Sequence, residues 1–287
     1  MAISHQTAQA GMGTAASAGD GTEDAVARTM RLLAPARFDD VAAERRHRQE
    51  RLAAGFRLLA HLGLTTGVAG HISARDPEHP ERFWVNPLAV PFSAMRVRDL
   101  VLVDADGSVV EGDALVNAAA FAIHSSIHAA NPRVVSACHS HAPWGRPWSA
   151  TGRLIEATSQ DACAFFGAQA VVPGFSGVVL GLDAGDRIAA AFTAASMGPA
   201  GVTVAVHMNH GHITIGESVD AAVFRFVLFE QMCQSQMRLE ATGRSYHVLD
   251  DETAASTAEQ VGSEYAAWLG FQSAYAEILA RDPSVLD

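Results

Sequence analysis

The amino-acid sequence predicts a single α/β domain with a tail at each end. Segments typical of helices alternate with segments typical of strands, and no stretch rich in Pro, Gly or Ser divides the middle of the chain. The chain has 287 residues, of which 49% are hydrophobic. A chain of this length and composition can bury a sizeable core without disulfides, so we expect an ordinary globular fold.

The first half of the chain predicts one helix followed by strands. Residues 41–62 place apolar side chains at helical spacing after a charged start. Residues 65–73 are interrupted by glycines, and residues 83–85 are strand formers between two prolines. Residues 100–103 and 108–110 flank the turn sequence Asp-Ala-Asp-Gly, which indicates a strand, a tight turn and a second strand.

The second half of the sequence continues to alternate predicted helices and strands. Residues 117–130 are rich in Ala, begin with a capping-type Asn and precede Asn-Pro, so we expect a helix there. Residues 133–141 and 202–207 alternate in the manner of buried strands, and residues 218–241 predict a long helix. Three shorter features are an apolar run at 170–173, a helix near 184–195 and an apolar segment at 213–216.

Composition excludes several classes of function. The chain has 20 Lys+Arg against 31 Asp+Glu, a net charge of −11, and no run of Lys/Arg, which argues against nucleic-acid and membrane-surface partners. It contains no uninterrupted apolar window of ~18 residues and no secretory signal pattern at its start. Its three cysteines are widely spaced and form no CxxC motif. We therefore expect a cytoplasmic protein with core thiols, no membrane segment and no nucleic-acid partner.

Histidines are concentrated at two predicted strand ends. Of the 13 histidines, His139 and His141 are two positions apart on a strand, so their side chains share one face. His207, His210 and His212 follow the strand at 202–207. Two strand ends of one sheet can converge on one ion, so His139, His141 and one of these three would form a site with three nitrogen ligands. Such a site suits Zn²⁺, Fe²⁺ or Co²⁺ and leaves positions open for substrate.

A third pair, His124 and His128, has the i, i+4 spacing of a helix face. This spacing also suits a metal, but no glutamate of an HExxH motif accompanies the pair. The helix could equally bury a histidine face against the sheet. The sequence also lacks a P-loop, a GxSxG elbow and a dinucleotide fingerprint, so the histidines are the main candidates for chemistry.

The chain resembles the class II aldolase/adducin family. The resemblance covers roughly residues 63–243 and includes the loop sequence GVAGHIS at 67–73 and the motif His139-Ser140-His141. The other matching motifs lie at 84–87, 99–107, 111–112, 122–124, 160–163 and 209–211. The resemblance implies a three-layer α/β/α fold around a mostly antiparallel sheet. Together with the tails at both ends, we expect an N-terminal disordered tail (1–35), the aldolase-like domain (36–245) and a C-terminal helical extension (246–287).

The resemblance further implies one divalent metal per subunit, held by His139, His141 and His210. Family enzymes use this metal to stabilise negative charge next to a breaking bond, and they take a helix-start glutamate as acid/base. In this chain the matching segment is Ala118-Ala119-Ala120, so the carboxylate is missing. The phosphate-binding loops differ too, because His71 replaces Asn. These departures argue against a phosphosugar. Apolar residues at 88–95 are either part of a pocket for a more hydrophobic ligand or plain core residues.

A branch of the family keeps the three histidines without aldolase chemistry: the non-haem iron oxygenases of aminocoumarin biosynthesis. We therefore expect an enzyme with Fe²⁺ or Zn²⁺ that cleaves a C–C bond of a small, non-phosphorylated 2-oxo or 2-hydroxy acid or carbonyl. The reaction would be either Fe(II)/O₂ oxidative decarboxylation or redox-neutral lyase chemistry. The candidate acid/base residues are His124, His71 and His212.

The resemblance also suggests substrate contacts and an assembly. Candidate substrate-binding residues are Ser73, Asn86, Gln160 and Tyr265. Tyr265 is included because a tyrosine from a neighbour's C-terminal region reaches the site in relatives, which commonly form homotetramers with sites between subunits. Tyr265 could equally belong to a helix-packing stripe. The alternative function is a non-catalytic interaction module like the adducin head domains, which lack the metal histidines.

Overall fold

The computed structural model describes residues 34–175, 177–178 and 181–287. Residues 37–287 form one compact unit, and the following description concerns this unit. The predicted tail, residues 1–35, lies outside the described residues except for residues 34 and 35.

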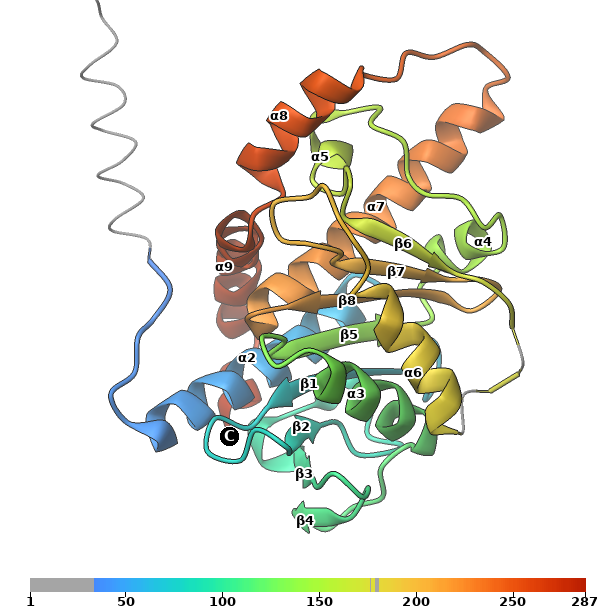
Figure 1. Cartoon of the computed structure of the whole chain (residues 1–287). Coiled ribbons are helices and arrows are strands. Elements are labelled where there is room, and N and C mark those ends of the chain that lie inside the picture. Colours follow the sequence, from blue (N-terminus) through green and yellow to red (C-terminus); the bar gives the residue numbers. More distant parts are fainter. Residues whose placement is uncertain (1–33, 176, 179–180) are drawn as a thin grey trace, which may run out of the picture. The chain divides into compact units, whose positions relative to one another are not determined.

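The unit is built on one eight-stranded sheet, in the order β4-β3-β2-β1-β5-β8-β7-β6 (Figure 1). Neighbouring strands are antiparallel except for the parallel pair β6 and β7. The strands are β1 (Gly70–Arg75), β2 (Phe83–Val85), β3 (Val101–Val103), β4 (Val109–Glu111), β5 (Ser136–Ser140), β6 (Gln169–Val172), β7 (Val204–His207) and β8 (Gly211–Gly216). The expected mostly antiparallel sheet is confirmed.

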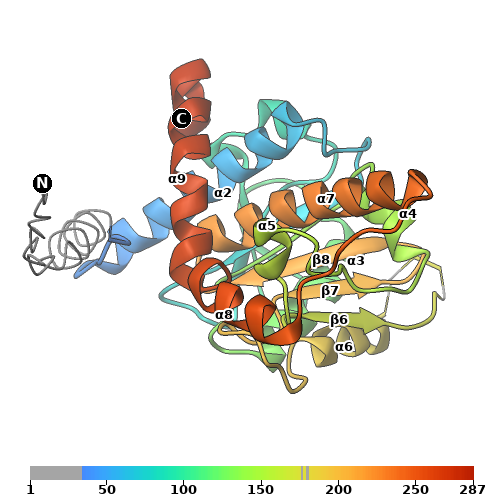
Figure 2. The same cartoon turned by 90° about the horizontal axis from the view of Figure 1, so that it is seen from above.

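Helices cover both faces of this sheet, so the structure has three layers. Figures 1 and 2 show α6 on one side and α7 on the other; α3 packs beside α6, and α2 and α9 pack beside α7. The helices are α2 (Val41–His61), α3 (Ala118–Ala130), α4 (Gly145–Ser149), α5 (Gln160–Cys163), α6 (Leu182–Ala191), α7 (Val219–Ala241), α8 (Asp251–Val261) and α9 (Glu264–Arg281). Short 3₁₀ turns lie at Phe92–Ala94, Val97–Asp99 and Pro283–Leu286.

Side chains alternate between the two cores because successive residues of a strand point to opposite faces. On β5, Cys138 is buried in the core with α2 and α7, whereas Ala137 is buried in the core with α3 and α6. Ile72 of β1 and Ile213 of β8 follow the same rule on opposite faces. His139 follows Cys138, so its side chain lies on the α3 face of the sheet.

The predicted helices and strands appear within a few residues of their expected bounds. Asn117 caps α3 as expected, because its Oδ1 accepts from Ala119 N at 2.9 Å. The apolar run at 170–173 becomes β6, and the glycine-rich segment 65–73 supplies the start of β1. The predicted C-terminal extension contains α8 and α9, and α9 packs against α7 and α2 within the same compact unit. Among the described residues, no helix is both long and apolar enough to cross a membrane.

Candidate metal centre

Three histidines from two parts of the sheet converge at one point. One ring nitrogen from each of His139, His141 and His210 lies within 4.8 Å of those of the other two. The ring centroids are 4.9 Å apart for His139 and His210, 5.0 Å for His141 and His210, and 5.4 Å for His139 and His141. This spacing allows the three rings to bind a single ion.

The ends of β5 and the β7–β8 turn hold these rings in position. His139 is on β5 and His141 follows the strand, where Thr66 Oγ1 donates to its carbonyl at 2.9 Å. His210 lies in the turn between β7 and β8. Asn209 adopts a φ of 60° there, a left-handed conformation that Asn tolerates better than most side chains. The turn therefore depends on the Asn-His-Gly sequence that the resemblance singled out.

The hydrogen bonds of His139 leave one nitrogen free for an ion. Its Nδ1 lies 2.8 Å from the backbone carbonyl of His212, to which it must donate. The opposite nitrogen, Nε2, is buried and has no hydrogen-bond partner among the described residues, and the same holds for Nδ1 of His210. Buried polar atoms are normally satisfied, so the orphaned nitrogen of His139 fits a metal ligand.

The electrostatics keep these imidazoles in the form that binds metals. Burial lowers the pKa of His139 well below its ordinary value, and the neighbouring His71 and His210 lower it further. Burial, together with His207 and His141, lowers the pKa of His210 to about 4. Burial and Arg146 also lower the pKa of His141. The three rings are therefore neutral near pH 7, as nitrogen ligands of Zn²⁺ or Fe²⁺ must be.

The three histidines lie at the wall of a cavity of about 500 Å³. His71, Arg146, Asn117 and Asn209 supply the other polar side chains. The apolar wall comes from Val68, Ala69, Ala119, Ile123, Phe175 and Val178. No carboxylate lies among the described residues that line it. A cation and a largely apolar wall beside a metal site favour a small organic anion with an apolar part.

Arg146 is held at the cavity by a short helix whose start is anchored to α7. The carboxylate of Glu230 accepts from the amide of Gly145 at 2.6 Å and also from that of Trp144. Gly145 is necessary here, because a Cβ would lie 2.2 Å from Nδ1 of His212. Nε of Arg146 donates to the Ala142 carbonyl at 3.2 Å. No sequence motif singled out Arg146, although it lies only five residues after His141.

The three candidate acid/base histidines occupy different places. His71 lines the cavity, and its ring centroid is 5.0 Å from that of His139. His124 is fully buried behind His71 and does not line the cavity. His212 packs against Phe226 and Phe229 on the α7 face of the sheet, so its side chain is away from the cavity.

The candidate substrate-binding residues also lie apart from the described cavity lining. Ser73 is buried on β1 and hydrogen-bonds to histidines, and Asn86 is buried with its Nδ2 3.5 Å from the carbonyl of Gly70. Gln160 is exposed at the start of α5, and Tyr265 lies on α9 with its ring 5.6 Å from that of Trp268. Asn86 lies beside the wall, because Gly70 lines the cavity.

Of the two alternatives for the apolar residues at 88–95, the core reading holds for Phe92, Met95 and Val90, and none of the segment lines the described cavity. Phe92 and Met95 are buried in the core beneath α2, and Val90 packs against that core. Phe92 packs edge to face against Phe56 of α2, with ring centroids 4.6 Å apart, which holds this part of the segment in the core. The apolar wall of the cavity comes instead from the loops around Val68 and Phe175 and from α3.

Comparisons with known proteins show which family the chain is similar to. Residues 50–237 match the Class II Aldolase and Adducin N-terminal domain. Decarboxylase NovR of Streptomyces niveus is 39% identical over 253 residues, which cover 88% of this chain and 91% of that protein. The 4-hydroxy-3-prenylphenylpyruvate oxygenase/4-hydroxy-3-prenylbenzoate synthase of Streptomyces roseochromogenus subsp. oscitans is 38% identical over 253 residues, 88% of each protein.

A solved structure agrees as well. The L-fuculose 1-phosphate aldolase from Glaciozyma antarctica PI12 is similar with a TM-score of 0.80 and 34% identity, covering 90% of this chain and 99% of that one. The resemblance inferred from the sequence motifs is therefore confirmed. This chain belongs to the class II aldolase and adducin family.

Proposed function

We propose that this protein is a metal-dependent enzyme that oxidatively decarboxylates a small, non-phosphorylated aryl 2-oxo or 2-hydroxy acid. The observation that carries the proposal is the convergence of His139, His141 and His210 in a cavity that also presents Arg146 and no carboxylate among its described lining residues. The printed names of the two bacterial relatives, a decarboxylase and a phenylpyruvate oxygenase, support the same chemistry.

The residues that line the cavity have different roles in the proposed reaction. The three histidines would hold the ion, which as Fe²⁺ supplies Lewis-acid polarisation and the electron transfer that O₂ chemistry requires. Arg146 would attract the carboxylate of the substrate through charge-assisted hydrogen bonds. Phe175 and Ile123 would contact its aryl part and exclude water.

The proposed reaction needs no other reductant. A 2-oxo acid, R–CH₂–CO–COOH, and O₂ give R–CH(OH)–COOH and CO₂. Loss of the carboxyl carbon oxidises the 2-oxo acid by two electrons, and hydroxylation of the CH₂ group supplies two more, so together they reduce both atoms of O₂. This balance is consistent with a site that lacks a glutamate base.

The test is O₂ consumption and CO₂ release by the iron-loaded protein with 4-hydroxyphenylpyruvate and 4-hydroxymandelate. We expect turnover that falls by about 100-fold or more in His139→Ala, because a catalytic metal supplies several kcal/mol of stabilisation. His61→Ala, which changes an exposed histidine on α2, is the matched control and should turn over normally. Equal activity of His139→Ala and wild type would refute the proposal.

Redox-neutral lyase chemistry is the second candidate, since the structurally similar protein from Glaciozyma antarctica is named as an aldolase. Substrate cleavage without O₂ uptake would favour it. A protein that purifies without metal and cleaves nothing would instead match the adducin-like interaction module. We also propose the homotetramer expected from the resemblance, and light scattering would test this assembly.

A further inference from the structure

A chain of hydrogen bonds runs from the cavity into the buried layer between the sheet and α3. His71 Nδ1 lies 2.5 Å from His124 Nε2, and His124 Nδ1 lies 2.5 Å from Ser73 Oγ. Ser73 Oγ lies 2.8 Å from His128 Nε2, and His128 Nδ1 lies 3.3 Å from the carbonyl of Val134. All four side chains are buried, and among them only His71 lines the metal cavity.

The last hydrogen bond of this series determines which ring nitrogen of each histidine carries a proton. A carbonyl oxygen only accepts, so Nδ1 of His128 must carry the hydrogen that reaches Val134. Nε2 of His128 is then an acceptor, and the hydroxyl of Ser73 donates to it. Ser73 Oγ accepts from Nδ1–H of His124, which leaves His124 Nε2 to accept from Nδ1–H of His71. The reverse arrangement would set two lone pairs against each other at 3.3 Å.

A positive charge on the buried histidines of this hydrogen-bond series is disfavoured. Burial is the main cause that lowers the pKa of His128 to about 3, and the nearby guanidinium of Arg75 lowers it further. Burial likewise lowers the pKa of His124 well below its ordinary value. Because burial disfavours an additional proton on His124 or His128, these hydrogen bonds do not favour a charged relay. They instead hold one neutral arrangement.

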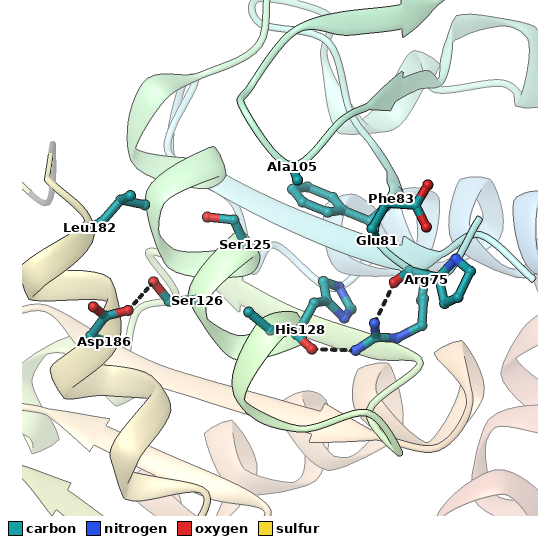
Figure 3. A pocket seen from close by; sticks show the side chains of 11 residues that line it. Arg75, Glu81, Phe83, Ala105, Ser125, Ser126, His128, Leu182 and Asp186 are labelled. Carbon is teal, nitrogen blue, oxygen red and sulfur yellow. Dashed lines mark hydrogen bonds between the residues drawn. The ribbon is translucent and has the colours of Figure 1, made fainter.

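The surroundings of His128 agree with this conclusion. Figure 3 shows His128 at a second pocket, where Arg75 donates from Nη2 to its backbone carbonyl at 2.6 Å. The cation therefore lies on the side where a proton leaving the chain would have to emerge. A protonated His128 would meet this positive charge at close range, which opposes proton release into the second pocket.

We infer that His124, Ser73 and His128 fix the tautomer of His71, so that His71 presents an unprotonated Nε2 to the metal cavity as a hydrogen-bond acceptor. His71 is thus a specificity-determining residue, and the other three are positioning residues. Their effect on the substrate passes through the ring of His71 alone.

This inference rests on the proposed function and narrows its substrate class. A neutral acceptor binds a hydroxyl or an enol, which can donate, and repels a carboxylate or phosphate oxygen, which cannot. The carboxylate is therefore bound by Arg146 and the donor group faces His71. A 2-hydroxy acid, or the enol form of an aryl 2-oxo acid, meets both requirements.

The tautomer is measured directly by ¹⁵N NMR of the histidine rings in metal-free protein. We expect His71 to be protonated at Nδ1 and not at Nε2. In Ser73→Ala the chain is interrupted, and His71 should become a mixture of tautomers. Ser126→Ala is the matched control, because Ser126 is a serine on α3 whose hydroxyl donates to Asp186 at 2.7 Å outside the chain (Figure 3). An Nε2-protonated His71 in wild type would overturn the inference.

A second measurement uses calorimetry on zinc-loaded protein. It compares the binding of 4-hydroxymandelate with that of the analogue in which the hydroxyl on the carbon next to the carboxylate is replaced by methoxy. The methoxy analogue cannot donate a hydrogen bond to His71. The ratio of its Kd to that of the hydroxy acid should therefore be about tenfold larger in wild type than in His71→Leu, as expected for the loss of one buried hydrogen bond. An unchanged preference in His71→Leu would contradict the inference. The NMR result is independent of metal and turnover, so failure of the proposed function alone would leave the expected tautomer intact.

Discussion

His139 donates its Nδ1–H to the backbone carbonyl of His212, 2.8 Å away on the adjacent strand. This bond determines the tautomer of His139 and leaves Nε2 as the nitrogen that can bind an ion. His212 contributes its carbonyl, while its ring lies on the opposite face of the sheet. His139 therefore acts through its ring and His212 through its backbone carbonyl.

We predict that His212→Leu keeps the metal. Because the carbonyl belongs to the backbone, the substitution should leave the bond to His139 and the three ligand rings in place. It removes the contact of Nε2 with the Phe226 carbonyl at 3.3 Å, so the free energy of unfolding should fall by about 1 kcal/mol. Elemental analysis and chemical denaturation measure the two effects. A metal content as low as that of His139→Ala would show that the ring itself takes part.

Arg146→Met should weaken binding of carboxylate substrates. A charge-assisted hydrogen bond contributes about 1.5–3 kcal/mol, so Kd for 4-hydroxymandelate should rise by roughly 10- to 100-fold. The matched control is Arg153→Met, because Arg153 pairs with Glu240 at 2.9 Å and does not line the cavity. Calorimetry on the zinc-loaded protein measures Kd. Equal losses in both variants would contradict a carboxylate role for Arg146.

Gly145→Ala should destabilise the fold. The added Cβ would lie 2.2 Å from Nδ1 of His212 and 2.8 Å from Oε2 of Glu230, both of them buried. Overpacking of this kind lowers the free energy of unfolding by about 1–3 kcal/mol. Gly181→Ala is the control, because nothing lies within 4 Å of its added Cβ. Equal melting temperatures for Gly145→Ala and wild type would contradict the predicted clash.

Stability should decline in mild acid. Burial lowers the pKa of both His128 and His212 from 6.5 to about 3 in the folded protein. Below pH 6.5 the unfolded chain takes up these protons and the folded chain does not, so stability is lost as the pH falls towards 3. Each histidine contributes up to about 1.4 kcal/mol per pH unit in this range. Denaturation with chelator present excludes metal loss, and a flat profile between pH 6.5 and 4 would refute the prediction.

Much of the fold follows from local pattern. The capping Asn117, the turn after Val103 and the alternation before His139 predict a helix, a hairpin and a strand that the structure contains. The His-x-His spacing placed two rings on one face because strands have a period of two. The same period predicts that His212, two residues after His210, shares its face, but His210 lies in the turn before β8 begins. The local sequence pattern alone does not tell whether His210 belongs to the strand or to the turn before it.

The cavity itself depends on contacts between distant segments. The sequence leaves open whether apolar residues at 88–95 line a pocket or belong to the core, and Phe92 and Met95 join the core because Phe56 of α2 packs against Phe92. Arg146 reaches the cavity because Glu230, far along the chain, anchors the start of α4. The hydrogen bonds that link His71 to His124, and His124 through Ser73 to His128, likewise require the pairing of β1 with β5 and the packing of α3. The spacing of residues along the sequence does not predict these long-range contacts.

The metal content of anaerobically purified protein shows whether the three histidines bind an ion. We predict about one iron or zinc per chain, lost in His139→Ala, His141→Ala and His210→Ala. His207→Asn should retain the metal, because His207 is close to His210, with ring centroids 5.0 Å apart, but outside the group of three converging nitrogens. No metal in the wild type, or retention in His210→Ala together with loss in His207→Asn, would contradict this account of the site.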